Sequence, residues 1–195
     1  EVQEQWEDAG SAAVMTTEAL HPLLPTGTPA LLVDALPNNL RVIPKSGPER
    51  ILPLPLADHR SKPHPVSRRG GTEEAAVLFT AAEQGRARGA ILTHRGLIAN
   101  LRSTISMMRL KEDDRVLAVL PQVHAFGLTV GLNAALAAGA AIVPVERYHP
   151  VRTLELTTRM GVTVFAGVPA MFIGLLSVLE RAPQSLESLR ITLSG

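Results

Sequence analysis

Short apolar runs that alternate with helix-like stretches dominate the chain from residue 75 onward and constrain its fold more than any other feature. Five mostly apolar runs are separated by four segments with helical periodicity. Apolar strands that alternate with helices are typical of a parallel sheet covered on both faces. The sequence therefore predicts an α/β fold with a doubly wound, mostly parallel sheet flanked by helices. The expected strands are 75–79, 116–120, 141–145, 162–165 and 189–193, and the expected helices are 94–109, 126–138, 150–161 and 169–181.

The ends and the buried faces of these helices can be predicted as well. Thr93 is a suitable N-cap for helix 94–109, because its hydroxyl can accept a backbone hydrogen bond from the first turn. Pro150 suits the first turn of the third helix, and Gly161 suits its end. The apolar spacing places Leu97, Ile98, Leu101 and Ile105 on the buried face of the first helix, and Phe172, Ile173, Leu176 and Leu179 on that of the last.

The region before residue 74 has a different composition. Ten of the 15 prolines lie between Pro22 and Pro65, and proline removes backbone donors. We therefore expect residues 35–73 to be irregular, extended or meandering, with an exposed connector at 61–71. The sequence predicts two parts, residues 1–73 and an α/β subdomain at 74–195, unless both form one continuous domain. In the first part, the expected helices are 2–8 and 18–24, and the expected strands are 12–16 and 30–33.

Composition argues against several classes of function. The 19 basic and 18 acidic residues leave a net charge of +1, and aromatic residues make up 3% of the chain, so no nucleic-acid partner is expected. The chain has no cysteine, which excludes thiolate catalysis and cysteine-ligated metals, and we expect no metal centre. Residues 116–145 carry no charge, but their proline, polar residues, alanines and glycines favour buried strands and a helix over a transmembrane segment. We expect a cytoplasmic protein.

Three loops are candidates for a ligand site, because ligands of parallel sheets bind where strands end at their carboxyl side. The loop at 80–93 contains glycines and arginines and could cradle a phosphate, although a solvated loop fits the same residues. The loop at 121–126 contains His124, which could face a cleft or be a structural group with its hydrogen bonds satisfied in the fold. The turn at 166–169 by itself indicates only close packing.

Four motifs follow one another along the second part of the chain. Residues 80–89 keep the register of T-S-G-[ST]-T-G-x-P-K-G and lead into A-I-L-T-H. L-P-x-x-H-x-x-G is matched at 120–127, V-P-[TA]-M at 168–171, and the chain closes with L-R-I-T-L-S-G at 189–195. With these motifs the chain resembles the AMP-forming adenylating superfamily, which includes acyl-CoA and acyl-carrier-protein synthetases.

The resemblance implies the large N-terminal domain of an acyl-adenylate synthetase and a two-step reaction. ATP with Mg²⁺ and a carboxylic acid would form an acyl-adenylate and pyrophosphate, and the thiol of CoA or of phosphopantetheine would then take the acyl group. The implied substrate is a fatty acid, and the implied partners are an acyl carrier protein and the rest of the parent chain. By their places in the motifs, Thr80, Gly85, Arg86, Arg88 and Gly89 would bind the phosphates, His124 would be catalytic, and Phe126, Gly127, Gly167, Val168 and Pro169 would border the carboxylate and acyl pocket.

The first motif departs from the family pattern. Ala81, Ala82, Glu83 and Gln84 stand where the family has hydroxyls and a glycine, and Arg88 stands in place of lysine. Glu83 would bring a carboxylate near a triphosphate, and two like charges at 4 Å repel by on the order of 4 kcal/mol near a protein surface. The phosphate loop is therefore expected to be degenerate. The alternative to an enzyme is a pseudoenzyme that binds acyl groups or docks to a protein without turning over ATP.

The chain begins at Glu1 rather than at methionine and ends at Gly195 directly after an apolar run. We expect it to be a segment of a larger protein. It stops before the adenine and ribose motifs of the family, and it lacks the C-terminal domain that carries the family's catalytic lysine. We therefore predict that this segment alone does not catalyse adenylation, so any ligase activity would belong to the full-length parent.

Overall fold

The computed structural model describes residues 14–16, 21–26, 28–36, 39–44, 46–48, 50–53, 68–80 and 87–195. The chain divides into two compact units, each described here by itself. One unit comprises Glu1–Arg69 with Phe79–Ile91, and the other comprises Gly70–Leu78 with Leu92–Gly195. The predicted division after residue 73 stays a prediction. The expected helix at 2–8 lies outside the described residues.

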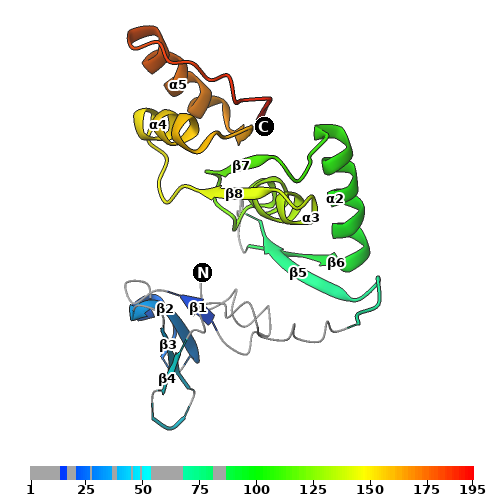
Figure 1. Ribbon diagram of the computed structural model, residues 1–195. Coiled ribbons are helices and arrows are strands. Elements are labelled where there is room, and N and C mark those ends of the chain that lie inside the picture. Colours follow the sequence, from blue (N-terminus) through cyan, green and yellow to red (C-terminus); the bar gives the residue numbers. More distant parts are fainter. Residues whose placement is uncertain are drawn as a thin grey trace. The chain divides into compact units, whose positions relative to one another are not determined.

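The first unit holds a four-stranded sheet in the order β1-β2-β3-β4 (Figure 1). Strand β1 pairs parallel with β2, and β2, β3 and β4 pair antiparallel in succession. Ala30 and Leu32 of β2 are buried and form the described core of this unit. The expected helix at 18–24 is a single 3-10 turn, η1, within its described part. The bounds are Val14–Thr16 (β1), His21–Leu23 (η1), Ala30–Leu36 (β2), Asn39–Ile43 (β3) and Arg50–Pro53 (β4).

Within the region 35–73, expected to be irregular, extended or meandering, β3 and β4 are extended strands that pair antiparallel in succession. Pro44 and Pro48 lie in the connection between these two strands, where they interrupt no ladder. Pro53 is the last residue of β4, an edge strand, and a missing N–H is tolerated there. A high proline count therefore marks strand ends here rather than the absence of strands. Of the expected connector, only residues 68–71 are described, and they are exposed.

The second unit is built on a four-stranded parallel sheet in the order β10-β9-β7-β8. Four of the five predicted strands therefore share one sheet, as expected. The strand bounds are Arg115–Ala118 (β7), Ala141–Pro144 (β8), Val164–Gly167 (β9) and Ile191–Ser194 (β10). The helices are His94–Met108 (α2), the π-helix Gly127–Ala134 (η2) continued by Ala135–Ala137 (α3), Pro150–Met160 (α4) and Pro169–Arg181 (α5).

The prediction that strand 75–79 belongs to the parallel sheet is wrong. This strand, β5 (Glu74–Phe79), forms a separate two-stranded sheet with β6 (Gly89–Thr93). The N–H of Thr80 donates to the carbonyl of Arg88 at 3.0 Å, and the N–H of His94 donates to that of Glu73 at 3.1 Å. The residue after one strand thus bonds to the residue before the other, so the two strands run antiparallel. The residues of β6 lie within the predicted loop 80–93 and carry no separate strand signal.

The helices lie on both faces of the parallel sheet. The connection from β7 to β8 runs through η2 and α3, whereas α4 and α5 lead from β8 to β9 and from β9 to β10, in the opposite direction along the sheet. Because crossovers between parallel strands are right-handed, connections in opposite directions place their helices on opposite faces. Helix α4 packs against α5, and α2 packs against η2 (Figure 1). The doubly wound α/β fold is therefore confirmed.

Helix ends follow the predictions more closely than helix faces do. The N–H of Gly96 donates to the Thr93 hydroxyl at 3.2 Å, and Gly161 ends α4 with a left-handed φ of 58°. The apolar face of α5 is rotated from its predicted position. Leu175 is buried, whereas Ile173 and Leu176 are 64% and 60% exposed. In α2, Ile98 is 47% exposed, and the buried residues are Thr104 and Met108.

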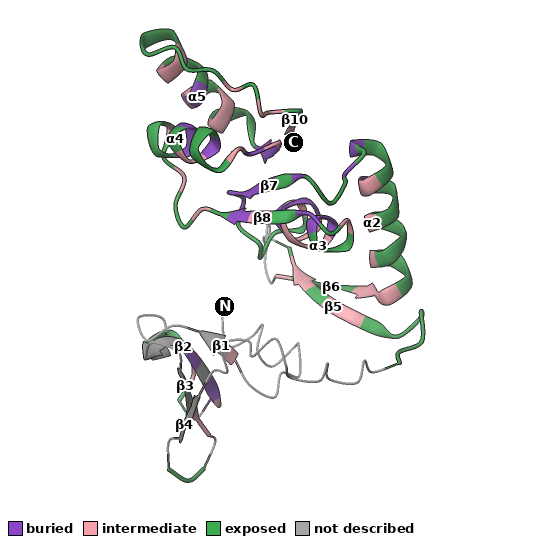
Figure 2. Ribbon diagram, viewed as in Figure 1, coloured by how far each residue is buried: buried purple, intermediate pink, exposed green. Residues whose placement is uncertain are grey.

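Strands β7 and β9 supply the most deeply buried residues of the core, and Figure 2 shows the buried part of β7 in purple. Val116, Leu117, Val164 and Phe165 are at most 2% exposed, and full burial of one such side chain stabilises a fold by about 1.5–3 kcal/mol. The uncharged stretch at 116–145 is largely accounted for by this burial. Among the described residues, no helix is long and apolar enough to cross a membrane.

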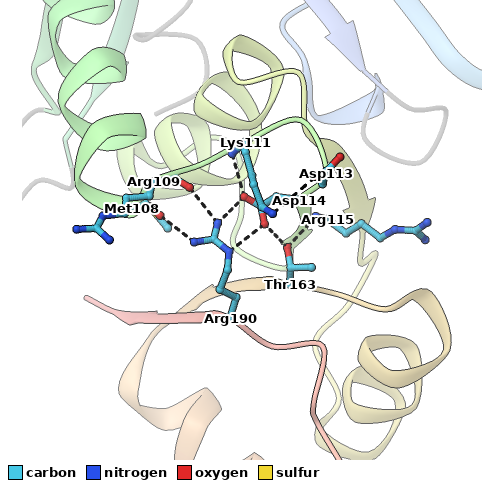
Figure 3. Close-up of polar contacts among 8 residues, drawn as sticks. All are labelled: Met108, Arg109, Lys111, Asp113, Asp114, Arg115, Thr163 and Arg190. Atoms are coloured by element: carbon cyan, nitrogen blue, oxygen red, sulfur yellow. Dashed lines mark hydrogen bonds and ion pairs between the residues drawn. The ribbon is translucent and has the colours of Figure 1, made fainter.

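A buried ion pair joins the amino ends of three strands in this sheet (Figure 3). Asp114, which precedes β7, is 1% exposed and pairs with Arg190, which precedes β10. The hydroxyl of Thr163, before β9, donates to Asp114 Oδ1 at 2.7 Å and accepts the N–H of Arg115 at 2.9 Å. Burial alone would raise the pKa of the Asp114 carboxyl, but the hydrogen bonds from Arg190, Thr163 and Lys111 and the Arg190 charge together hold it below its ordinary value.

Candidate functional site

The order of the strands selects one place in the second unit as a ligand site. After β7 the chain connects to β8 on one side of the sheet, and after the neighbouring strand β9 it connects to β10 on the other side. Two adjacent strands whose connections leave in opposite directions open a crevice at their carboxyl ends, and open α/β sheets bind ligands there. The turns at this point are 119–126, which contains the predicted loop 121–126, and Val168, which lies within the predicted loop 166–169.

The turn after β7 is held by its backbone. The N–H of His124 donates to the carbonyl of Pro121 at 3.2 Å, and the carbonyl of His124 accepts the N–H of Leu128 at 2.9 Å. A Cβ on Gly127 would lie 2.3 Å from the carbonyl oxygen of Pro121, so this position admits only glycine without a backbone shift. The spacing of proline, histidine and glycine in the second motif therefore has a structural cause. The side chain of His124 is exposed.

Neighbouring side chains pack closely against the turn after β9. Gly167 is buried, and a Cβ there would lie 3.2 Å from the ring of Phe165 and 3.4 Å from the sulfur of Met171. Val168 has an extended backbone, with φ −87° and ψ 157°, and Pro169 begins α5. The residue preceding proline is restricted to such a conformation, which fixes the sharp change from strand to helix. Val168 and Pro169 remain exposed at the crevice.

The end of β10 brings the two turns together. The N–H of Gly195 donates to the carbonyl of Gly167 at 3.3 Å. A Cβ on Gly195 would lie 3.2 Å from the ring of Phe126, so that ring lies directly against the glycine. Phe126, Gly167 and Gly195, from three separate motifs, therefore meet at the carboxyl ends of β7, β9 and β10. Gly195 was not among the predicted site residues, although it stands at the end of the fourth motif.

Tyr148 supports this region and was not predicted by sequence reasoning. Its hydroxyl donates to the carbonyl of Met171 at 2.6 Å, in the first turn of α5. Burial raises the pKa of the Tyr148 phenol above its ordinary value, so it stays protonated as a donor. The only sequence signal was that the chain contains a single tyrosine.

A cleft of about 560 Å³ lies at the carboxyl ends of β7 and β8. Its lining includes Leu120, Pro121 and Gln122 after β7, and Val145 and Glu146 after β8. His124 and Phe126 do not line this cleft and lie two and four residues after Gln122 in the chain. Across the described ranges, no group of three or more histidine, aspartate or glutamate side chains could hold a metal ion.

Most of the predicted phosphate loop cannot be placed. Gly85 and Arg86 fall in 81–86, outside the described residues. The hydroxyl of Thr80 donates to the carbonyl of Arg88 at 3.3 Å, and Thr80, Arg88 and Gly89 are all exposed. These three residues belong to the first unit, whereas His124, Phe126, Gly127, Gly167, Val168 and Pro169 belong to the second. The structure thus brings together the predicted acyl-pocket residues within the second unit. The described residues of the predicted phosphate loop belong to the first unit.

Comparison with known proteins matches the whole chain, residues 1–195, to the family model described as AMP-binding enzyme. The chain is similar to 4-coumarate--CoA ligase 5 of Oryza sativa subsp. japonica, with 32% identity over 127 residues that cover 63% of this chain and 24% of that protein. It is similar to the medium-chain fatty-acid--CoA ligase of Escherichia coli, with 34% identity over 125 residues that cover 64% of this chain and 22% of that protein. The chain thus spans about a quarter of the length of these relatives.

Solved structures share the fold. ATP-bound MatB from Rhodopseudomonas palustris superimposes with a TM-score of 0.76 at 24% identity, over 98% of this chain and 36% of that one. A putative long-chain-fatty-acid CoA ligase from the same organism superimposes with a TM-score of 0.73 at 26% identity, over 97% of this chain and 46% of that one. The likeness to MatB concerns the fold alone.

Proposed function

Because the chain belongs to the AMP-binding enzyme family, we propose that it supplies part of the N-terminal domain of an acyl-CoA or acyl-carrier-protein synthetase. The observation that carries this proposal is the meeting of Phe126, Gly167 and Gly195 at the switch point of the parallel sheet. Small residues and one aromatic ring at this place would leave room for a carboxylate and its acyl chain. The family match and the names of the CoA-ligase relatives support the same reaction class.

The proposed reaction has two steps. A carboxylate oxygen attacks the α-phosphorus of ATP, pyrophosphate leaves, and an acyl-adenylate forms. The sulfur of CoA or phosphopantetheine then attacks the acyl carbon, and AMP leaves. Mg²⁺ would arrive bound to the phosphate oxygens of ATP, because the described residues offer no metal-binding cluster of their own.

The residues of this chain would bind and orient the reactants. The exposed Thr80, Arg88 and Gly89, with Gly85 and Arg86, would neutralise and cradle the phosphates. His124, exposed directly after β7, would border the reacting carboxylate and donate or accept a proton there. The acyl chain would lie along Phe126, Gly127, Gly167, Val168 and Pro169. Holding carboxylate and phosphate in line would supply most of the catalysis.

We propose a fatty acid as the substrate, in a cytoplasmic setting. Support comes from the similarity to a medium-chain fatty-acid ligase and from the apolar sequence that follows His124. The similarity to 4-coumarate ligases makes an aromatic acid the second choice. The acceptor would be CoA or an acyl carrier protein.

A second candidate function is an acyl-binding or docking module that does not turn over ATP. The observation that favours it is the replacement of the loop hydroxyls and first glycine by Ala81, Ala82, Glu83 and Gln84. Each lost hydroxyl removes a hydrogen bond of about 0.5–1.5 kcal/mol. The acyl pocket could persist after ATP binding is lost, because its residues belong to other strands.

Pyrophosphate release by the full-length protein tests the proposal. With Mg-ATP and a series of fatty acids, the ligase is expected to release pyrophosphate only when the acid is present. Calorimetric titration with Mg-ATP separates the two candidates, since tight binding excludes the docking module. The chain of 195 residues alone is expected to release none.

A further inference from the structure

A groove beside α4 is lined by three arginines that make no ion pair with any described residue, and it shares Pro144, Val145 and Glu146 with the cleft at the carboxyl ends of β7 and β8. The groove has a volume of about 400 Å³ and runs between the segment after β8 and one face of α4. Arg147 comes from that segment, and Arg152 and Arg159 come from the helix. A volume of this size is typical of small-molecule sites.

The three guanidinium groups make no ion pair within the described residues. Among the described residues, the salt bridges pair Lys111 with Asp113 and Arg190 with Asp114, and no hydrogen bond involves the side chains of Arg147, Arg152 or Arg159. All three residues are exposed where they line the groove. Their planar donor pairs match phosphate oxygens.

A buried hydroxyl in the same groove is also without a partner. Thr153 lines the groove and is 1% exposed, and its Oγ1 is the one buried side-chain polar atom of the described residues that makes no hydrogen bond. A threonine within a helix can satisfy its hydroxyl on the carbonyl four residues earlier, as Thr157 does on Thr153 at 2.7 Å. The hydroxyl of Thr153 makes no such hydrogen bond.

The helix adds to the positive potential of the groove. The first turn of α4 contains no acidic residue, and its N-cap His149 makes no side-chain capping bond. The backbone N–H groups of this turn therefore carry an uncompensated partial charge near Arg152. Glu146 and Glu155 also line the groove, so its side chains sum to 3 − 2 = +1. Such carboxylates could accept hydrogen bonds from hydroxyl groups of a ligand.

We propose that this groove binds a small phosphate-bearing molecule, with the phosphate held by Arg147, Arg152 and Arg159 and by the hydroxyl of Thr153. The lining of the groove shares no residue with the phosphate loop at 80–89, which the proposed function assigns to ATP. Its ligand would be a phosphate monoester or diphosphate that also carries hydroxyl groups.

Titration of the ¹⁵N-labelled chain with inorganic pyrophosphate at constant ionic strength tests the proposal. Chemical-shift changes are expected at 145–159, separate from any at 80–94 that report on the phosphate loop. The double variant R152Q/R159Q is expected to bind about tenfold more weakly at this site. The matched control R102Q/R181Q removes the same charge from exposed positions elsewhere and is expected to bind as the wild type does.

A conservative variant tests the hydroxyl. Thr153→Val is expected to weaken pyrophosphate binding several-fold while leaving the melting temperature unchanged or higher, because the hydroxyl has no partner in the protein. The proposal is overturned if shifts are confined to 80–94, or if both double variants lose affinity equally, which would indicate an adventitious ion only. Unchanged affinity in Thr153→Val would remove the hydroxyl from the site.

Discussion

The guanidinium of Arg190 binds the carboxylate of Asp114 across the amino ends of the parallel strands, although 76 residues separate them in the chain. The same guanidinium donates to the carbonyl of Arg109 at 3.1 Å, directly after α2. This contact links β10 to β7 at the amino ends of the strands, and the candidate site lies at their carboxyl ends. It therefore helps to fix the position in which Gly195, four residues after the start of β10, meets Phe126.

Removing the carboxylate should destabilise the second unit. Asp114→Ala removes a buried carboxylate and its hydrogen bonds, while Arg190 is 35% exposed and can be solvated, so the free energy of unfolding is expected to fall by about 1–3 kcal/mol. Asp113→Ala is the matched control, because its ion pair with Lys111 is exposed and should contribute at most about 1 kcal/mol. Denaturant unfolding measures both. Equal losses in the two variants would show that burial of the Asp114 pair contributes nothing.

The Asp114 pair also predicts how stability depends on pH. The folded pKa of this carboxyl lies below its unfolded value of about 3.9, so ionised Asp114 stabilises the fold at pH values above that. The contribution is expected to be lost as the pH falls through the folded pKa. Unfolding measured from pH 5 to pH 2 should show a steeper decline in the wild type than in Asp114→Asn, because the loss occurs below the unfolded pKa. Parallel curves would contradict the assignment.

Two glycines near the candidate site should respond in opposite ways to the same substitution. Gly127→Ala places a methyl group 2.3 Å from the Pro121 carbonyl and should cost about 1–3 kcal/mol of unfolding free energy. Gly131→Ala, in the same π-helix, meets no atom closer than 3.8 Å and should be neutral or stabilising by up to about 1 kcal/mol. Thermal unfolding distinguishes them. A tolerated alanine at 127 would mean that the turn is not tight.

The hydroxyl of Tyr148 should contribute to stability through one bond. Tyr148→Phe keeps the ring and removes the donor to the Met171 carbonyl, so the free energy of unfolding should fall by about 0.5–1.5 kcal/mol. Ser177→Ala is a suitable control, because its exposed bond to Ile173 lies within the same helix. That variant should change stability less. An unchanged free energy of unfolding in Tyr148→Phe would show that water replaces this hydrogen bond.

The loop substitutions predict a gain of affinity. Glu83→Thr in the full-length protein restores a hydroxyl and removes a carboxylate, so Mg-ATP should bind more tightly. Titration calorimetry measures the change, and Glu73→Thr, which alters an acidic residue before β5, controls for net charge. Unchanged affinity would mean that Glu83 lies away from the nucleotide.

The sequence predicted those features that depend on local chemistry. Thr93 caps α2, Gly161 ends α4 in a left-handed conformation, and continuous apolar runs became β7 and β9. It did not predict which strands pair. β5 reads as a buried parallel strand, yet it pairs with β6, whose five residues carried no separate signal. Pairing depends on tertiary contacts that no local pattern encodes.

The site was predictable to a similar extent. The motifs around His124 and Val168 marked two loops, and the strand order places both at the switch point. The contact of Phe126 with Gly195 joins residues far apart in the chain, and only the fold reveals it. The exposed Ile173 and Leu176 show why the face of α5 was misjudged, since an almost wholly apolar helix has no clear polar side.

The central claim is that the carboxyl ends of β7, β9 and β10 border the acid in an adenylation reaction. Pyrophosphate release by the full-length protein with Mg-ATP and fatty acids tests this most directly, with Val168→Trp as the variant that narrows the acyl pocket, because Val168 is exposed at the crevice whereas Gly167 is packed against core side chains. We predict acid-dependent release in the wild type and a shift toward shorter acids in the variant. Release that is absent with every acid, or that keeps the same acid preference in Val168→Trp, would contradict the account.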